Sequence, residues 1–135
     1  MIKTNFLENL PGNFKYEKSF LIKNKINDSR KLSRLSDCEL NIIQQTCLLC
    51  SLNNLKKIRA IAIFNSELSI SPNESYLLLH CGISSIKSLA TLNPHDLKVR
   101  IGKLERILGT KSRIKITLPI LKDWIQRANQ ICKSI

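Results

Sequence analysis

An internal repeat constrains the fold of this chain more than any other feature of its sequence. The apolar positions of residues 20–40 coincide without gaps with those of residues 77–97. The pattern resumes where Leu55–Ala62 resembles Leu121–Ala128, and between these blocks the second copy is nine residues longer. Since a unit of this size cannot bury its apolar face alone, two copies that share one core are expected. The matched pairs are Phe20 and Leu77, Leu21 and Leu78, Ile22 and Leu79, Ile26 and Ile83, Leu32 and Leu89, Leu35 and Leu92, and Leu40 and Leu97.

Each copy is expected to contain a short helix, a tight hairpin and a second short helix. In the second copy, Ser71, Pro72 and Glu74 make a typical helix start, with a capping serine and a glutamate three positions later. Gly82 is expected to end that helix, because glycine adopts the left-handed conformation most easily. In the first copy Lys25 occupies the matching position, so the first hairpin is expected to be looser or differently shaped.

Further helix signals complete both copies. Ser84 or Ser85 is expected to cap the helix after the second hairpin, and Asn93 to cap the following one. Trp124 lies on the apolar stripe of a final helix, with Leu121, Ile125 and Ala128.

These signals predict an all-α fold of two tandem helix-hairpin-helix-like units related by a pseudo-two-fold repeat. In the first unit, a helix is expected from Asp37 and another over Leu55–Phe64, with an interruption at residues 51–54. The predicted organisation is an N-terminal segment 1–9, a first unit 10–64, a linker 65–70, and a second unit 71–135 that contains a basic insertion at 98–118.

The charge balance points to an anionic partner. The 22 lysines and arginines outnumber the 10 acidic residues, for a net charge of +12, whereas a small domain needs only about 2–8 charges for solubility. Nucleic acid, an anionic membrane surface and an acidic protein surface would each fit this excess, as would lysines that simply cover solvated faces. No apolar run reaches the ~18 residues of a membrane span, and the first residues do not form a secretory signal. A soluble protein that stays where it is made is expected.

Two groups of basic residues are the candidate binding residues. If residues 98–108 are helical and residues 111–116 extended, each segment presents cations that can follow a phosphate backbone, although a solvated loop would have the same composition. The first group is Lys98, Arg100, Lys103, Arg106, Lys111, Arg113 and Lys115; the second, around the first hairpin, includes Lys23, Lys25, Arg30 and Lys31.

The cysteines and histidines do not form a recognisable chemical motif. Cys47 and Cys50 have the spacing of half a zinc knuckle, but no companion pair follows, and Leu48 and Leu49 between them indicate a buried helix. The five cysteines are therefore expected to be reduced core thiols, without a metal site or a redox motif. The sequence lacks a glycine-rich phosphate loop, a nucleophile elbow and carboxylates paired near a histidine. A non-enzymatic protein without cofactor or small-molecule substrate is predicted.

The segment Leu78–Leu89 resembles the helix-hairpin-helix module, and a similar run occurs in the C-terminal domain of the bacterial RNA polymerase alpha subunit. The whole chain is similar to a two-repeat family of unknown function found in cyanobacteria and red-algal plastid genomes. The matching points are Leu10-Pro11-Gly12, the hairpin, and Trp124-Ile125-Gln126-Arg127-Ala128. This resemblance implies the fold and a location in the plastid stroma or a cyanobacterial-type cytoplasm, but no activity.

One departure from the module bears on function. Helix-hairpin-helix modules that hold DNA usually carry a second glycine two residues after the first, whereas here Ser84 follows Gly82 and Asn27 follows Lys25. The Ser84 hydroxyl and the backbone at Gly82 could still contact one phosphate. Two hypotheses follow: non-specific binding of duplex nucleic acid through its backbone, or docking of the basic insertion onto an acidic protein surface within a larger plastid assembly.

Overall fold

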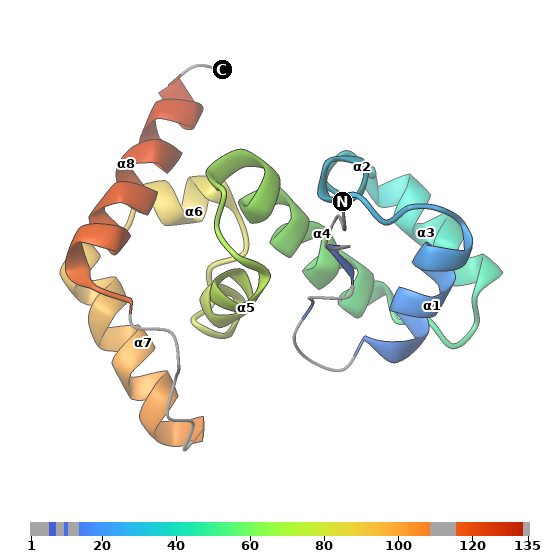
Figure 1. Ribbon diagram of the computed structural model, residues 1–135, viewed down its shortest axis with the longest axis horizontal. Coiled ribbons are helices and arrows are strands. Elements are labelled where there is room, and N and C mark those ends of the chain that lie inside the picture. The colour runs from blue at the N-terminus through green and yellow to red at the C-terminus, as the bar shows by residue number, and fades with distance from the viewer. Residues whose placement is uncertain (1–5, 8–9, 11–13, 109–115, 134–135) are drawn as a thin grey trace, which may run out of the picture. The chain divides into compact units, whose positions relative to one another are not determined.

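The computed structural model describes residues 6–7, 10, 14–108 and 116–133 (Figure 1). The described part of the chain is all-helical, with eight α-helices and no strand. Within these ranges no helix combines the length and apolar character that crossing a membrane requires. The helices are α1 (Lys15–Lys23), α2 (Ser29–Ser33), α3 (Asp37–Thr46), α4 (Leu52–Leu68), α5 (Pro72–His80), α6 (Ile86–Ala90), α7 (Pro94–Leu108) and α8 (Leu118–Lys133).

The chain divides into two compact units, Met1–Tyr76 and Leu77–Ile135. In the first unit α2 and α3 pack on α4, and in the second unit α6 and α7 pack on α8. Each unit contains one long helix, α4 or α8, on which its own short helices pack. Helix α4 continues to Leu68, into the segment 65–70 that was expected to be a linker, and the boundary between the units falls inside α5.

The core of the first unit is built around α4. Ile58, Ile61 and Phe64 recur at helical spacing and are fully buried. Burial of each such side chain contributes about 1.5–3 kcal/mol. Leu21 of α1, Leu32 of α2 and Leu40 of α3 are buried as well. These three leucines come from the repeat alignment, which therefore identified core positions correctly.

The helix starts follow the predicted caps. The Ser71 hydroxyl accepts from the Glu74 N–H at 3.2 Å, and the Glu74 carboxylate accepts in return from the Ser71 hydroxyl at 2.9 Å. Ser85, one of the two serines considered, caps α6. The Asn93 side chain accepts from the His95 N–H at 2.8 Å at the start of α7. Trp124, Leu121, Ile125 and Ala128 of α8 are buried, as predicted.

Both hairpins close with the same hydrogen bonds. The Ile26 N–H donates to the Leu21 carbonyl at 2.8 Å, and the Ile83 N–H donates to the Leu78 carbonyl at 3.0 Å. These are the bonds of a helix end closed by one left-handed residue. Gly82 has φ +87° and Lys25 has φ +60°. The expectation of a differently shaped first hairpin was wrong, because Lys25 adopts the left-handed conformation despite its Cβ atom.

Lys25→Gly is expected to stabilise the first unit by roughly 0.5–1 kcal/mol. Relief of left-handed strain gains about 1–2 kcal/mol, and the greater freedom of glycine in the unfolded chain offsets part of it. Gly82→Ala is the opposite control: a Cβ there meets no atom within 4 Å, so its expected loss of about 1 kcal/mol is conformational. Urea unfolding followed by circular dichroism measures both. A destabilised Lys25→Gly protein would contradict the argument.

The segment between α3 and α4 is a turn and not the buried helix that its leucines suggested. The Cys50 N–H donates to the Cys47 carbonyl at 3.1 Å, which closes the turn. Leu48 and Leu49 lie at its tip and are 90% and 67% exposed. The reason is local, because α3 ends at Thr46 and the Ser51 hydroxyl caps α4 five residues later. The two leucines therefore cannot continue the apolar face of either helix.

Candidate nucleic-acid interface

Helix α7 separates an apolar face from a cationic one. Leu97 and Ile101, one turn apart, are buried and anchor the helix in the second unit. The basic residues share the exposed surface of the helix with Asp96 and Val99. The Arg106 Nε donates to the Gly102 carbonyl at 3.3 Å, which folds its side chain back along the helix. The four cations predicted on this helix are all exposed: Lys98, Arg100, Lys103 and Arg106.

No described carboxylate pairs with these cations. Within residues 14–104 and 116–133, the ion pairs join Arg59 to Asp37 at 2.8 Å and Arg127 to Asp123 at 3.6 Å. The second unit carries eleven basic and three acidic residues, a net charge of +8, against eleven and seven, a net charge of +4, in the first. The positive charge of the chain is therefore concentrated in the second unit. The other three predicted cations of the insertion, Lys111, Arg113 and Lys115, lie outside the described residues.

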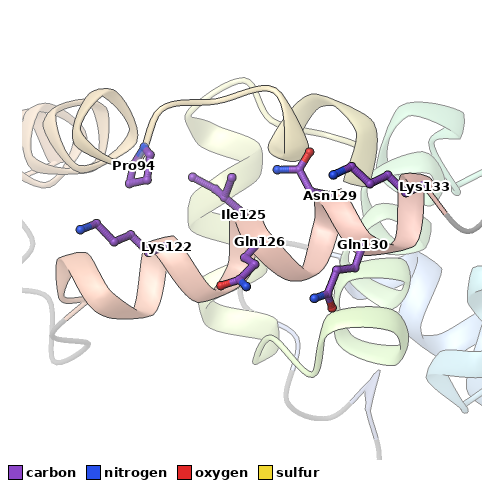
Figure 2. A pocket seen from close by; sticks show the side chains of 7 residues that line it. All are labelled: Pro94, Lys122, Ile125, Gln126, Asn129, Gln130 and Lys133. Atoms are coloured by element: carbon purple, nitrogen blue, oxygen red, sulfur yellow. The ribbon is translucent and has the colours of Figure 1, made fainter.

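A depression of about 580 Å³ runs along one side of α8 (Figure 2). Lys122 and Lys133 lie at its two ends, about 16 Å apart along the helix axis, and amide side chains lie between them. Pro94, at the start of α7, lines the depression beside Lys122. Lys98 follows Pro94 by one helical turn, on the same side of α7. The full lining is Pro94, Lys122, Ile125, Gln126, Asn129, Gln130 and Lys133.

The two lysines of this depression are absent from the sequence-based candidates. A signal for them exists, because residues 122, 126, 129 and 133 are all polar and follow one face of a helix. The apolar stripe of this segment predicts its buried face, whereas the polar stripe marks the face that lines the depression. The depression adds two cations and several amide donors to the exposed surface of the second unit.

The second hairpin presents neutral donors. Gly82 and Ser84 are exposed, and no described residue accepts a hydrogen bond from the Ser84 N–H. The Ser85 hydroxyl accepts from the Ser88 N–H at 3.1 Å, so the cap of α6 carries no charge. A phosphate oxygen that approaches this hairpin would meet donors and no carboxylate of the hairpin itself.

The first hairpin combines cations with an acid. Lys23, Lys25, Arg30 and Lys31 are exposed, as the candidate assignment requires. Asp28 caps α2, however, and its carboxylate accepts from the Arg30 N–H at 3.1 Å. The carboxylate occupies the helix N-terminus to which a phosphate would bind, and it repels an anion there. The first hairpin is therefore the poorer phosphate site in spite of its lysines.

The side chains that could support metal or acid–base chemistry do not converge in the described ranges. No group of three or more histidine, cysteine, aspartate or glutamate side chains there is placed to hold a metal ion. Glu17, the buried carboxylate of α1, is engaged at the N-terminus of α4, where it accepts from the Ser51 N–H at 2.8 Å and from the Asn54 amide at 3.3 Å. Its contacts are those of a structural residue.

Comparison with known proteins identifies the family. A family model described as a domain of unknown function, DUF4332, matches residues 11–131. Searches of curated proteins and of solved structures gave no match. The matched segment covers most of the chain and includes both hairpins and the helix that carries Trp124. The chain therefore belongs to the DUF4332 family.

Proposed function

We propose that this chain is a non-enzymatic protein of two helix-hairpin-helix-like units that binds duplex nucleic acid through backbone phosphates. The repeated architecture is supported by hairpins that close with equivalent hydrogen bonds and by equivalent buried leucines, Leu32 and Leu89. The second unit is the binding unit in this proposal. The proposed location is a plastid stroma or a cyanobacterial-type cytoplasm, and its support is the resemblance to plastid and cyanobacterial sequences.

The observation that carries the proposal is the cationic face of α7. Four exposed basic side chains lie on one helix, and none of them forms an ion pair with a described carboxylate. Each lysine or arginine that neutralises a phosphate releases condensed counterions, which supplies affinity without reading the base sequence. The same unit also carries the lysines of the α8 depression and the donors of the second hairpin. Non-specific backbone binding is the activity that such a surface supports best.

A duplex fits this surface better than a single strand does. Single-stranded nucleic acids are usually held by bases stacked on exposed aromatic rings. Trp124 is buried, and the one strongly exposed aromatic side chain in the described ranges is Tyr16, in the first unit. The binding surface of the second unit therefore offers charge and hydrogen bonds, which a regular phosphate backbone can use.

Binding of the full chain to a random-sequence DNA duplex and to structured RNA, measured across a salt series, tests the proposal. If the four cations of α7 each neutralise one phosphate, log affinity should fall with log salt with a slope of about −3.6 or steeper on duplex DNA. Different duplex sequences should give similar affinities. Absence of binding at low salt would remove the nucleic-acid proposal.

A second candidate function, docking onto an acidic protein partner, is favoured by one observation. Leu48, Leu49 and Ile42 form exposed apolar surface at the end of α3 and the following turn. Exposed apolar side chains that are grouped in this way often mark protein interfaces. A partner that stays bound after nuclease treatment and is lost on Leu48→Asp/Leu49→Asp substitution would favour docking. If the Leu48→Asp/Leu49→Asp variant still bound the partner, this apolar surface would not be the docking site.

A further inference from the structure

The turn between α3 and α4 brings two thiols together. Its closing hydrogen bond, from the Cys50 N–H to the Cys47 carbonyl, keeps the first and last Cα atoms of the turn within about 7 Å. A disulfide requires Cα atoms about 4.4–6.8 Å apart. The Cys50 thiol points at the Cys47 sulfur, and the two sulfur atoms are 2.6 Å apart. Backbone and side chains are therefore both arranged for a bond between these sulfurs.

We propose that Cys47 and Cys50 are a modification site that forms a reversible intramolecular disulfide by exchange with a small disulfide such as oxidised glutathione. The Cys47 thiolate attacks one sulfur of the small disulfide and releases one glutathione thiolate. Cys50 then attacks the Cys47 sulfur of the mixed disulfide and releases the second. Two protein thiols are oxidised, one small disulfide is reduced to two thiols, and the two protons pass to the leaving thiolates.

The surroundings of the two cysteines set the order of these steps. Cys50 is buried, whereas Cys47 is partly exposed and follows directly after α3. Burial, and next to it the hydrogen bond with Cys47, raises the pKa of the Cys50 thiol to about 12, and the charges of Cys47 and Glu17 act in the same direction. Thiolate is the attacking form. Cys47 is therefore the thiol that meets the external disulfide, and Cys50 resolves the mixed disulfide.

The remaining cysteine of the first unit is an internal control. Cys38 is exposed near the start of α3, and about 13 Å of helix separates it from Cys47. It cannot bridge to Cys47 without unfolding of α3. Cys38 is exposed but has no neighbouring thiol, so it should form a glutathione adduct and no cross-link.

The test is equilibration of the full chain in glutathione redox buffers, followed by alkylation and peptide mapping by mass spectrometry. The expected product is a Cys47–Cys50 cross-link, seen as loss of two hydrogen atoms within one peptide. The ratio of oxidised to reduced protein should be about tenfold higher in folded protein than in urea at the same buffer composition, since the fold holds the thiols together. An equal or lower ratio of oxidised to reduced protein in the folded state would overturn the proposal. A disulfide that includes Cys38 in place of Cys47 or Cys50 would overturn it as well.

Two serine variants test the order of attack. Cys50→Ser should trap glutathione on position 47, because the resolving thiol is absent. Cys47→Ser should leave Cys50 largely unmodified in the folded protein, because that thiol is buried. Equal modification of both variants, with helical circular dichroism retained, would contradict the assigned order. Peptide mapping of the wild-type chain shows whether the Cys47–Cys50 disulfide forms, even if a variant fails to fold.

Discussion

Charge reversal at Lys103 and Arg106 is expected to weaken binding to duplex DNA by about a hundredfold at low salt. Both side chains are exposed on α7. Each substitution to glutamate removes one phosphate contact and places a negative charge beside the phosphate backbone. The salt dependence should also become shallower, by about 0.9 in slope for each lost contact. Fluorescence anisotropy with a labelled duplex measures both quantities.

Lys56→Glu/Lys57→Glu is the matched control. These lysines are exposed on α4 in the first unit, and their reversal changes the net charge by the same amount. Affinity should fall only slightly, through the loss of long-range attraction. If the control weakened binding as much as the α7 variant did, net charge alone would account for it, and α7 would not be the interface. Helical circular dichroism of both proteins verifies that they are folded.

Replacement of Glu17 by alanine is expected to cost about 2–3 kcal/mol of stability. The carboxylate is only 2% exposed, and it accepts from the Ser51 N–H at the first turn of α4 and from the Asn54 amide. Hydrogen bonds to a charged acceptor contribute about 1.5–3 kcal/mol, and their loss leaves the half-buried Ser51 N–H and Asn54 amide without this partner. Urea unfolding followed by circular dichroism should show the loss. Glu17→Gln, which keeps an acceptor, should lose less.

Glu39→Ala separates this effect from ordinary helix capping. Glu39 completes the capping box of α3 with Ser36 but is exposed, so its removal should cost at most about 1 kcal/mol. If Glu17→Ala and Glu39→Ala lowered the free energy of unfolding equally, the contact of Glu17 with α4 would contribute no more to stability than a surface cap. Trp124 is the only tryptophan and lies in the second unit, so its fluorescence follows the unit that neither substitution touches.

Several features of this protein follow from the sequence alone. The gapless repeat identified Leu32, Leu40, Leu89 and Leu97 as equivalent positions, and all four are buried. The caps at Ser71 and Asn93 were predicted at the correct residues, and the cap of α6 was narrowed to Ser84 or Ser85, because a cap depends on a hydrogen bond between residues two or three apart. The cationic face of α7 followed from helical periodicity. Such features depend on neighbouring residues, which the sequence places together by itself.

Other features were decided by the tertiary structure. Leu48 and Leu49 suggested a buried helix, but α3 ends at Thr46 and Ser51 caps α4, so the segment between them is a turn that brings the two thiols together. Glu17 carried no sequence signal, since its partner at Ser51 is 34 residues away. The division into two units depends on which short helices pack on α4 and on α8. For Glu17 and for the two units, the deciding contacts join segments far apart in the chain, and local patterns of charge and hydrophobicity carry no information about such pairings.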